Sequence, residues 1–353
     1  MLAKRHGHGD QALQLFGVHG DALYTGRMHP TPTPLAWGII GCGKVTERKS
    51  GPAFNKVAGS RLVAVMRRNA ALAQSYAERH GVPRWYADAD ALINDPEVNA
   101  VYIATPPDSH HFYALKVAAA GKICCVEKPM AASHRECLEM VAAFEAAGLP
   151  LFVSYYRRSL PRFAQIQQWL DQGAIGAVRH VQWSFSRAPN AADVEQTPNW
   201  RTDVKVASGG YFEDLASHGL DLLQHLLGDI TQAKGIAGNQ QGLYAAADAV
   251  SGVWQFASGA TGSGYWNFAA AGALDEVLIH GSQGQIKFSI FGEQPVQLHN
   301  ADGTQSLEIA HPENIQFFHI ENMQKHVNGQ VFHPSTGQTA QRTTWVMEQI
   351  LGG

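Results

Sequence analysis

A pair of glycines is the first feature of the sequence whose spacing points to chemistry. Gly41 and Gly43 follow the apolar run Leu35–Ile40 and precede a helical pattern. In this context a tight turn and a helix N-terminus bind the phosphates of a dinucleotide. Gly41 would make the turn, and Gly43 would let the backbone approach the pyrophosphate. Thr46 stands where a third glycine is usual, so we expect the helix to lie slightly farther from the strand.

Two other interpretations of this loop remain. A tight strand-to-helix turn without a ligand would need the same glycines, and the run from Gly38 to Lys44 also fits an NTP-binding P-loop. Val45 lacks the hydroxyl that a P-loop offers to Mg²⁺, which argues against NTP. We therefore expect Gly41, Gly43, Lys44 and Val45 to bind a dinucleotide.

The end of the second apolar run, Arg61–Met66, indicates which dinucleotide. An NAD-binding protein usually carries an acidic residue there, which accepts a hydrogen bond from the ribose 2′-hydroxyl. Here Arg67 and Arg68 occupy the place, and guanidinium groups suit a 2′-phosphate and an adenine face. Two solvated surface arginines are the alternative. We predict NADP as the cofactor, with NAD as the second choice.

Strand-like and helical runs alternate between residues 35 and 155. The expected strands are Leu35–Ile40, Arg61–Met66, Ala100–Ala104, Ile123–Val126 and Leu151–Ser154, and the expected helices are Ala70–His80, His110–Ala120 and Ser133–Ala147. This alternation predicts parallel βαβ units, and with the glycine loop a Rossmann NAD(P)-binding domain. Residues 1–34, which end in the proline-rich Met28–Pro34, are expected to form a poorly ordered extension, with an ordered N-terminal arm as the alternative.

The pattern changes after Arg157. A helix over Pro161–Gln172, a strand over Val178–Ser186 and a helix over Gly210–Leu227 are followed by several strands with short Gly or Asn turns up to about Ile309. Two further helices are expected near Pro312–Asn328 and Ser335–Leu351. The pattern predicts an antiparallel sheet and so an α+β second domain over residues 156–353.

Four more segments share a resemblance with one family. They are Thr105-Pro106-Pro107-Asp108-Ser109-His110, Glu127-Lys128-Pro129, Asn199-Trp200-Arg201 and the stretch from Gly209 to His218 that contains Asp214. With the glycine loop, the chain from Leu35 onward resembles the Gfo/Idh/MocA oxidoreductases. The glycine loop is generic, whereas the E-K-P triplet and the D-x-x-x-H motif in this order are specific. The resemblance implies a Rossmann domain, then an α/β domain whose large open sheet covers the substrate cleft and forms homodimers or homotetramers.

The resemblance also implies residue roles. Lys128 matches the family's catalytic lysine, and Pro129 keeps it out of helical geometry. A cationic nicotinamide nearby would lower the pKa of Lys128 and so permit proton exchange with a substrate hydroxyl. The residues assigned to the cofactor site alongside Lys128 are Thr105, Pro106, His110 and Glu127.

Asp214 and His218 stand four residues apart, so a helix places them on one face. The resemblance implies that His218 is a general acid and base, and that Asp214 contacts substrate or orients the Lys128 and His218 pair. Asp221 could pair with His218 instead. Trp200 and Arg201 are expected to form a cleft wall, and the alternative is an interface tryptophan beside a surface arginine. The remaining expected substrate contacts are Tyr156 and Arg157, for which hinge packing is the alternative.

These features predict an NADP(H)-dependent oxidoreductase that moves hydride between nicotinamide and a sugar, a polyol or a related hydroxy or keto compound. One alternative is a glycoside hydrolase of the same fold that retains its NAD(P). Another is a nucleotide-binding protein without catalysis, which the presence of Lys128, Asp214 and His218 argues against.

Composition excludes several classes of protein. The chain has 353 residues, 45% of them apolar, and a formal net charge of −3, so it can build a core and carries no basic footprint for nucleic acid or anionic membrane. The cysteines are Cys42, Cys124, Cys125 and Cys137. They show neither zinc spacing nor a disulfide framework, which predicts no metal site and a reduced, cytoplasmic protein.

One charge-free stretch, Ala249–Leu274, predicts a β-hairpin rather than a membrane span. Its aromatic residues are Trp254, Phe256, Tyr265, Trp266 and Phe268. We expect them to form an exposed apolar face that pairs two subunits. In the alternative, they point into the core of their own subunit.

Overall fold

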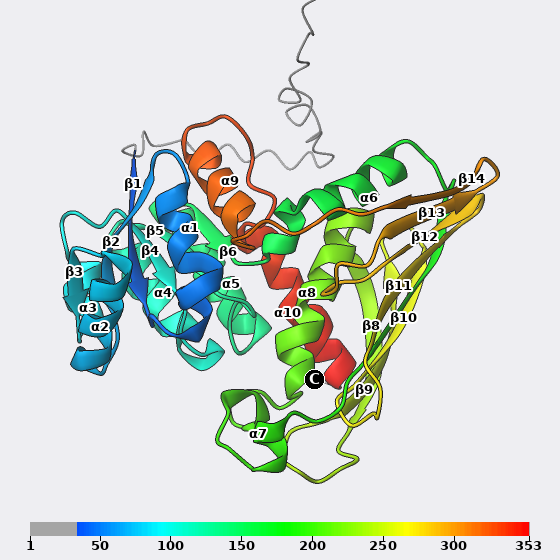
Figure 1. The fold of residues 1–353 in the computed structure, drawn as a ribbon, viewed down its shortest axis with the longest axis horizontal. Coiled ribbons are helices and arrows are strands. Elements are labelled where there is room, and N and C mark those ends of the chain that lie inside the picture. The colour runs from blue at the N-terminus through cyan, green and yellow to red at the C-terminus, as the bar shows by residue number, and fades with distance from the viewer. Residues whose placement is uncertain (1–33, 353) are drawn as a thin grey trace, which may run out of the picture.

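Six parallel strands form the first sheet of the computed structural model, which describes residues 34–352 (Figure 1). Apart from Pro34, the expected N-terminal extension lies outside the described residues. The strand order is β3-β2-β1-β4-β5-β6, the doubly wound order of dinucleotide-binding domains. The strands are β1 (Leu35–Ile40), β2 (Ser60–Met66), β3 (Arg84–Tyr86), β4 (Ala100–Ile103), β5 (Ile123–Val126) and β6 (Leu151–Val153).

Helices cover both faces of this sheet. They are η1 (Thr46–Ser50), α1 (Gly51–Lys56), α2 (Ala70–His80), α3 (Ala89–Ile93), η2 (Pro107–Ser109), α4 (His110–Ala119) and α5 (His134–Ala147). One apolar core joins the sheet to α3, α4 and α5, and a second joins its other face to α1 and α2. The expected strands and helices of this unit are confirmed within one residue at each end. β3 and α3 were not predicted.

Eight strands form the second sheet, in the order β14-β13-β12-β11-β7-β10-β9-β8. They are β7 (Val178–Ser186), β8 (Ile230–Gly238), β9 (Ala249–Phe256), β10 (Thr261–Asn267), β11 (Leu274–Gly281), β12 (Gly284–Phe288), β13 (Val296–Asn300) and β14 (Gly303–Leu307). All neighbouring pairs are antiparallel except β7 and β10, which run parallel. The predicted mostly antiparallel sheet and the hairpin formed by β9 and β10 are therefore confirmed.

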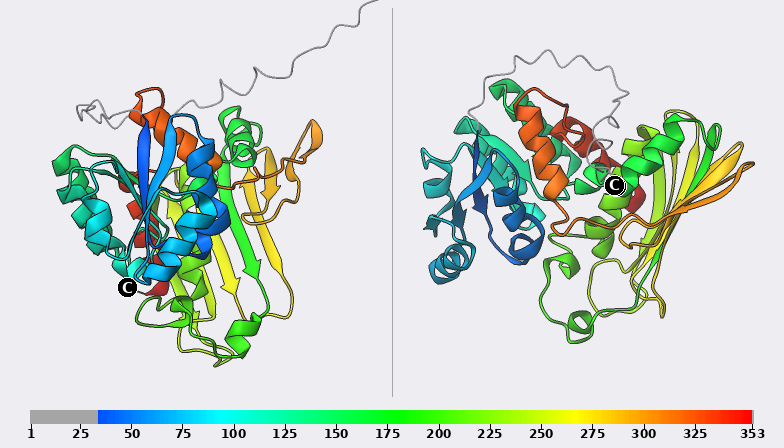
Figure 2. Two further views of the ribbon diagram at one scale, coloured as in Figure 1. Left: turned by 60° about the vertical axis from the view of Figure 1, so that its left-hand side comes forward. Right: turned by 45° about the horizontal axis from the view of Figure 1, so that its top comes forward.

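Helices cover only one face of the second sheet. α6 (Pro161–Asp171), α8 (Tyr211–Leu227) and α10 (Gly337–Leu351) lie on the side that faces the first unit, and no helix of residues 34–352 lies on the other side (Figures 1 and 2). The connection from β7 to α8 carries α7 (Ala191–Val194) and η4 (Trp200–Thr202). Nowhere in this described part of the chain is a helix both long and apolar enough to cross a membrane.

The aromatic residues of the hairpin point inward, contrary to our expectation. Trp254, Phe256, Trp266 and Phe268 are all at most 3% exposed and belong to the core under the helices. Tyr265 alone among the five faces outward, at 38% exposed. Successive residues of a strand point to opposite faces. The four buried rings therefore lie on the face that the helices cover, and Tyr265 lies on the other.

The end of the chain returns to the first unit. Ile320 and Met323 of α9 (Phe317–Val327) belong to the same core as α1 and α2, and Figure 1 shows α9 beside α1. α10 contacts α5 of the first unit as well as α8 and β8 of the second. The segment expected to form one second domain, residues 156–353, thus supplies a helix to the core of the Rossmann unit.

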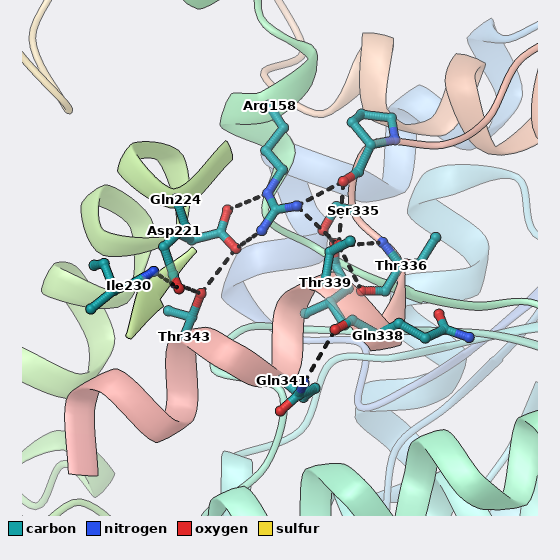
Figure 3. A network of polar contacts seen from close by, with 12 residues as sticks. Arg158, Asp221, Gln224, Ile230, Ser335, Thr336, Gln338, Thr339, Gln341 and Thr343 are labelled. Atoms are coloured by element: carbon teal, nitrogen blue, oxygen red, sulfur yellow. Dashed lines mark hydrogen bonds and ion pairs between the residues drawn. The ribbon is translucent and has the colours of Figure 1, made fainter. Parts of the chain in front are cut away.

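A buried ion pair fixes the junction between the two units (Figure 3). Arg158, in η3 (Tyr156–Ser159), donates from Nε to Asp221 Oδ2 at 2.7 Å and from Nη1 to the carbonyl of Pro334 at 2.7 Å. Thr343 of α10 donates to Asp221 Oδ1 at 3.2 Å. η3, α8 and α10 are therefore tied at one point. Asp221 is fully occupied there, so it is not the partner of His218.

Candidate active site

The glycine loop leaves open space where a dinucleotide phosphate would lie. Gly41 has φ +89°, and a β-carbon there would lie 2.8 Å from Thr105 Cγ2, so the chain itself requires this glycine. A β-carbon at Gly43 would meet only the Gly41 carbonyl oxygen, at an ordinary 3.7 Å. Packing within the chain therefore does not require a glycine at position 43. A glycine there is consistent with a ligand that approaches the backbone closely. Lys44 is exposed and Val45 half-buried at the start of the helix.

Thr46 is accommodated by an unusual first turn. Its side chain is buried and donates to the Gly43 carbonyl at 2.9 Å. The helix opens with the π-helical η1, in which Gly51 N–H donates to the Thr46 carbonyl, and Tyr76 also donates to that carbonyl at 2.9 Å. A wider first turn thus accompanies the missing third glycine.

Arg67 and Arg68 are exposed at the carboxyl end of β2. Arg67 is close enough to the glycine loop to act on Cys42, although burial dominates there and raises the pKa of that thiol to about 11. Within residues 34–352 neither guanidinium forms an ion pair. Two free cations beside an open glycine loop fit the 2′-phosphate of NADP.

The loop after β4 places Thr105 half-exposed and Pro106 exposed. His110 differs from our expectation, because its side chain is 0% exposed. Its Nδ1 lies 3.0 Å from the Pro129 carbonyl and its Nε2 lies 2.8 Å from the Thr105 carbonyl. Burial lowers the pKa of His110, so the ring is neutral and donates to only one of them. His110 therefore positions the two loops rather than offering its ring to a cofactor.

Glu127 is also occupied by the chain itself. Its Oε1 accepts from the hydroxyl of Tyr102 and from Gln316 Nε2, the latter at 3.0 Å, and its Oε2 accepts from the backbone N–H of Lys128 at 3.1 Å. The residue is 7% exposed. The carboxylate thus holds the backbone of Lys128, which differs from the expected cofactor contact.

Lys128 and Asp214 meet across the two units. Lys128 Nζ lies 2.5 Å from Asp214 Oδ1 and 2.9 Å from the Asp214 carbonyl oxygen, and Arg201 Nε lies 2.5 Å from Asp214 Oδ2. Burial alone would raise the pKa of Asp214, but Lys128 and Arg201 outweigh it and hold the pKa well below its usual range. The carboxylate stays ionised and fixes both cations.

Arg201 joins the site through a short turn. Asn199 accepts from the Arg201 backbone N–H at 3.2 Å, which caps η4. The Arg201 guanidinium lies 4.4 Å from the centre of the Trp200 ring, within range of a cation–π contact. Arg201 is therefore part of the Lys128 cluster and not a free surface arginine, and Trp200 stacks on it.

His218 lies one turn further along α8 and is 5% exposed. Its Nδ1 has no hydrogen-bond partner among the described residues. Its ring packs edge-on against Tyr156 at 5.3 Å and Phe291 at 6.0 Å between ring centres. Burial, and then the charges of Arg157, Lys128 and Lys49, lower its pKa well below 6.5. A neutral imidazole with a free nitrogen can accept a proton.

A cavity of about 330 Å³ shares two aromatic neighbours with His218, although His218 itself does not line it. Tyr156 and Phe291, which touch the imidazole, both line it. The other lining residues are Arg48, Lys49, Arg157, Leu160, His311, Glu313 and Ile315. The structure thus brings Tyr156 and Arg157 to a cavity next to His218, in addition to packing them at the junction. No group of three or more His, Cys, Asp or Glu side chains in residues 34–352 could hold a metal.

Several lining residues were not predicted from the sequence. Arg48 and Lys49 lie in η1, directly after the glycine loop, and their position there was an available signal. Phe291 and His311 come from connections before and after the last hairpin, and no motif marks them. Their place depends on how the second sheet folds back over the junction.

Comparisons with known proteins agree with this geometry. Residues 35–155 match the oxidoreductase family with an NAD-binding Rossmann fold, and residues 163–287 match the GFO/IDH/MocA C-terminal domain. Oxidoreductase P35 of Formosa agariphila is 38% identical over 319 residues, which cover 90% of this chain and 98% of that protein.

More distant relatives include a named reductase and a solved dehydrogenase. The 1,5-anhydro-D-fructose reductase of Ensifer adhaerens is 27% identical over 77% of this chain and 82% of its own. The structure of a levoglucosan dehydrogenase in complex with NADH and levoglucosan superimposes with a TM-score of 0.79 at 24% identity, over 90% of this chain and 96% of that one. At this identity the superposition shows a shared fold.

Proposed function

The chain belongs to the Gfo/Idh/MocA family of oxidoreductases, and we propose that it moves hydride between NADP(H) and a sugar, a polyol or a related hydroxy or keto compound. One observation carries the proposal: Asp214 holds Lys128 one turn before His218 on α8, and the charge of Lys128 acts on the unpartnered imidazole of His218. The named activities of the relatives, a reductase of anhydrofructose and a levoglucosan dehydrogenase, favour a sugar-like substrate.

The residues present fit a bound NADP(H). Gly41, Gly43 and the start of η1 would hold its pyrophosphate, and Arg67 with Arg68 its 2′-phosphate. When bound, the nicotinamide accepts or supplies the hydride. The open space at Gly43 is the structural observation that supports this placement.

The protein's own side chains then manage the proton. Lys128 Nζ carries three N–H groups, of which two point to Asp214, so one is left to donate to a substrate oxygen. In the oxidation direction, neutral His218 accepts the hydroxyl proton as the carbon loses hydride. In the reduction direction, the imidazolium returns it.

The direct test is a spectroscopic screen. The protein is incubated with NADP⁺ or NAD⁺ and a panel of aldoses, polyols, inositols and dihydrodiols, and absorbance is followed at about 340 nm, with product analysis in parallel. We expect reduced cofactor to accumulate in proportion to ketone or lactone. Cleaved glycoside without net cofactor reduction would point to a hydrolase, and no turnover would contradict an enzymatic role.

Replacing His218 with alanine is expected to lower kcat about 100-fold, because general acid–base catalysis is typically worth at least that much. The cofactor Kd should stay the same. His218→Gln keeps a polar group of similar size and should be equally inactive, because an amide does not accept the proton. Full activity in His218→Gln would assign the proton transfer to another group.

Arg67→Asp should reverse the cofactor preference. The wild type is expected to bind NADP more tightly than NAD, because a charge-assisted contact to phosphate is roughly twice as strong as a neutral one. In the variant, an aspartate at the end of β2 would repel the 2′-phosphate and accept from a 2′-hydroxyl. Calorimetry with both cofactors measures this, with Arg61→Asp, an exposed arginine at the other end of β2, as control. Equal wild-type affinities would contradict the assignment.

We also propose that two subunits pair through the uncovered face of the second sheet. Ile236, Val253 and Tyr265 are 81%, 58% and 38% exposed on adjacent strands β8, β9 and β10. Ser251 lies between Ile236 and Tyr265 in the strand register, and the exposed Lys234 lies opposite Val253, so this patch carries a single positive charge. Such a face suits an isologous contact between copies.

Light scattering tests the pairing. The wild type should have at least a dimer mass at micromolar concentration. Val253→Glu, combined with Lys234→Ser to remove the cation opposite it in the register, should raise the dissociation constant on the order of 100-fold, because the contact would bury two unpaired charges. Leu72→Glu, on exposed α2, is the matched control. A monomeric wild type would contradict the pairing. A variant with both substitutions that dimerises as tightly as the wild type would show that the interface lies elsewhere.

Two assignments from the sequence stay proposals. We place the boundary between the two domains near Tyr155, after β6. α9 is the exception, because it packs into the core of the first domain. The four cysteines are buried and free, which favours a reducing compartment, and we propose the cytoplasm.

A further inference from the structure

We infer that the substrate is an acid, a sugar or polyol derivative whose carboxylate is bound by Arg157 in the cavity beside His218. This inference rests on the proposed function and adds the charge of the substrate to it. It starts from a cation inside the protein that the described residues do not neutralise.

Arg157 is 6% exposed. Its Nε donates to the Ile290 carbonyl at 2.9 Å, and its guanidinium lies between two rings, 4.9 Å from the centre of Tyr156 and 4.6 Å from that of Phe291. Its Nη1 has no hydrogen-bond partner among residues 34–352, and no carboxylate there forms an ion pair with it. A buried charge is costly unless it is paired, so an anion from outside the chain would stabilise this site.

The neighbouring arginines have most of their donors paired within the protein, although the buried Nε of Arg162 has no partner among residues 34–352. Arg158, also buried, forms a two-point contact with Asp221. Arg162 donates from both terminal nitrogens to backbone carbonyls, those of Gly292 and Gln294. Arg157 alone of these three lines the cavity. Nη1 itself is buried, but Nη2 is not fully buried and forms no hydrogen bond within residues 34–352, so this second donor is placed where a ligand can reach it.

Other residues that line the cavity add to the positive charge of Arg157. Arg48 and Lys49 line it from η1 and form no ion pair within the described residues. Glu313 is the one acidic lining residue, and its carboxylate is taken by Lys56 at 2.9 Å on the exposed rim. A site with three free cations and a neutralised acid attracts anions.

The position of this charge relative to His218 sets where the carboxylate lies in the substrate. Tyr156 and Phe291 contact both the guanidinium and the imidazole, so the two groups are close neighbours, although His218 does not itself line the cavity. A substrate with its carboxylate on Arg157 would extend past these two rings to bring its carbinol to His218 and Lys128. The cavity, about 330 Å³, has room for a single sugar-sized acid.

Matched pairs of compounds test the charge. The holoenzyme, saturated with NADP⁺ or NAD⁺, is assayed with D-galacturonate against D-galactose, D-glucuronate against D-glucose and D-gluconate against D-glucitol, with hexose phosphates as a third arm. We expect kcat/KM for the preferred acid to exceed that of its neutral partner by roughly 10- to 100-fold, the usual range for a charge-assisted hydrogen bond. Neutral sugars used equally well would overturn the inference and leave the proposed function intact, and phosphates preferred to carboxylates would also overturn it.

A binding measurement covers acids of the wrong stereochemistry for turnover. The melting temperature of the holoenzyme is measured with each acid, its neutral partner and NaCl of equal ionic strength. Acids should raise it in the wild type and not in Arg157→Met, whereas Arg135→Met, an 81% exposed side chain on α5, should behave as wild type. If no acid stabilises the wild type more than salt does, the inference is wrong, even where neutral sugars are oxidised.

The cofactor also carries anionic groups, so binding of Arg157 to a cofactor phosphate must be distinguished from binding to the substrate carboxylate. Arg157→Met should raise KM for the acid while the Kd for NADP⁺ stays unchanged. A weaker Kd for NADP⁺ with an unchanged KM for the acid would show that Arg157 binds a phosphate of the cofactor, and would overturn the inference. Absence of turnover with every compound in both cofactors would contradict the proposed function, and the melting experiment would still decide the charge.

Discussion

Replacing Lys128 with alanine is expected to lower kcat by a factor on the order of 100 to 1000, with little change in the Kd of the cofactor. Lys128 Nζ donates two of its hydrogen bonds to Asp214, which leaves one N–H to donate to the substrate oxygen. The variant loses the donor that stabilises the charge developing on that oxygen, which is a transition-state contact. Single-turnover kinetics measures the loss in the hydride step.

The structure supplies the control for this experiment. Asp214 is buried and ionised, and without Lys128 it keeps only Arg201 as partner. A loss of fold could therefore imitate a loss of catalysis. Lys128→Arg preserves the charge next to Asp214 but moves the donor, so it should be stable in thermal melting and still slow. Wild-type turnover in Lys128→Ala would remove Lys128 from the mechanism.

Long periodic elements could be predicted from the sequence alone. α2 and α5 show apolar residues at helical spacing over more than two turns, and the expected bounds agree with the structure within one residue. β3 and α3 have three and five residues. Elements this short do not contain a full repeat of the helical or the strand period. Their residues therefore show no periodic pattern from which they could be predicted.

The face that an element covers is harder to predict. Alternation in β10 shows that Tyr265 and Trp266 point in opposite directions. Which of the two meets a helix depends on α8 and α10, and α10 lies more than 70 residues further along the chain. We assigned the large rings to the wrong face for that reason.

The candidate site shows the same division. Lys128, Asp214 and His218 follow from short motifs, and the structure brings them together. Glu127 and His110 belong to the same motifs, yet the chain satisfies them, and one partner of Glu127 is Gln316, 189 residues away. A polar residue type shows that a hydrogen bond is needed, but not whether the chain or a ligand provides it.

Acidification is expected to destabilise the protein strongly below about pH 6.5, because it contains buried neutral histidines. His319 of α9 and His333, just after it, are 1% and 0% exposed and pack ring to ring at 4.8 Å. Burial lowers the pKa of His319 to about 3, and burial with the neighbouring His319 and His326 lowers that of His333 well below 6.5.

The direction follows from proton linkage. Between pH 6.5 and the folded pKa, the unfolded chain binds protons that the native state excludes, so stability is complete above pH 6.5 and falls as the pH decreases. At pH 5 each of the two histidines should cost about 2 kcal/mol, or about 4 kcal/mol together. The depressed carboxyl groups, Glu47 with a pKa of about 2 and Asp214 lower still, stay ionised in this range and do not contribute.

Urea midpoints between pH 8 and pH 5 measure the effect. Glu213 and Asp221, whose pKa burial raises, act in the opposite direction, so the decisive comparison is between variants. His319→Leu should lose about 2 kcal/mol of the pH dependence, and it breaks no strong bond, since His319 Nδ1 has no partner among the described residues and Nε2 meets only Cys125 Sγ at 3.8 Å. A pH profile identical to that of the wild type would mean that His319 is protonated in the native state, and that the junction around α9 tolerates a buried charge.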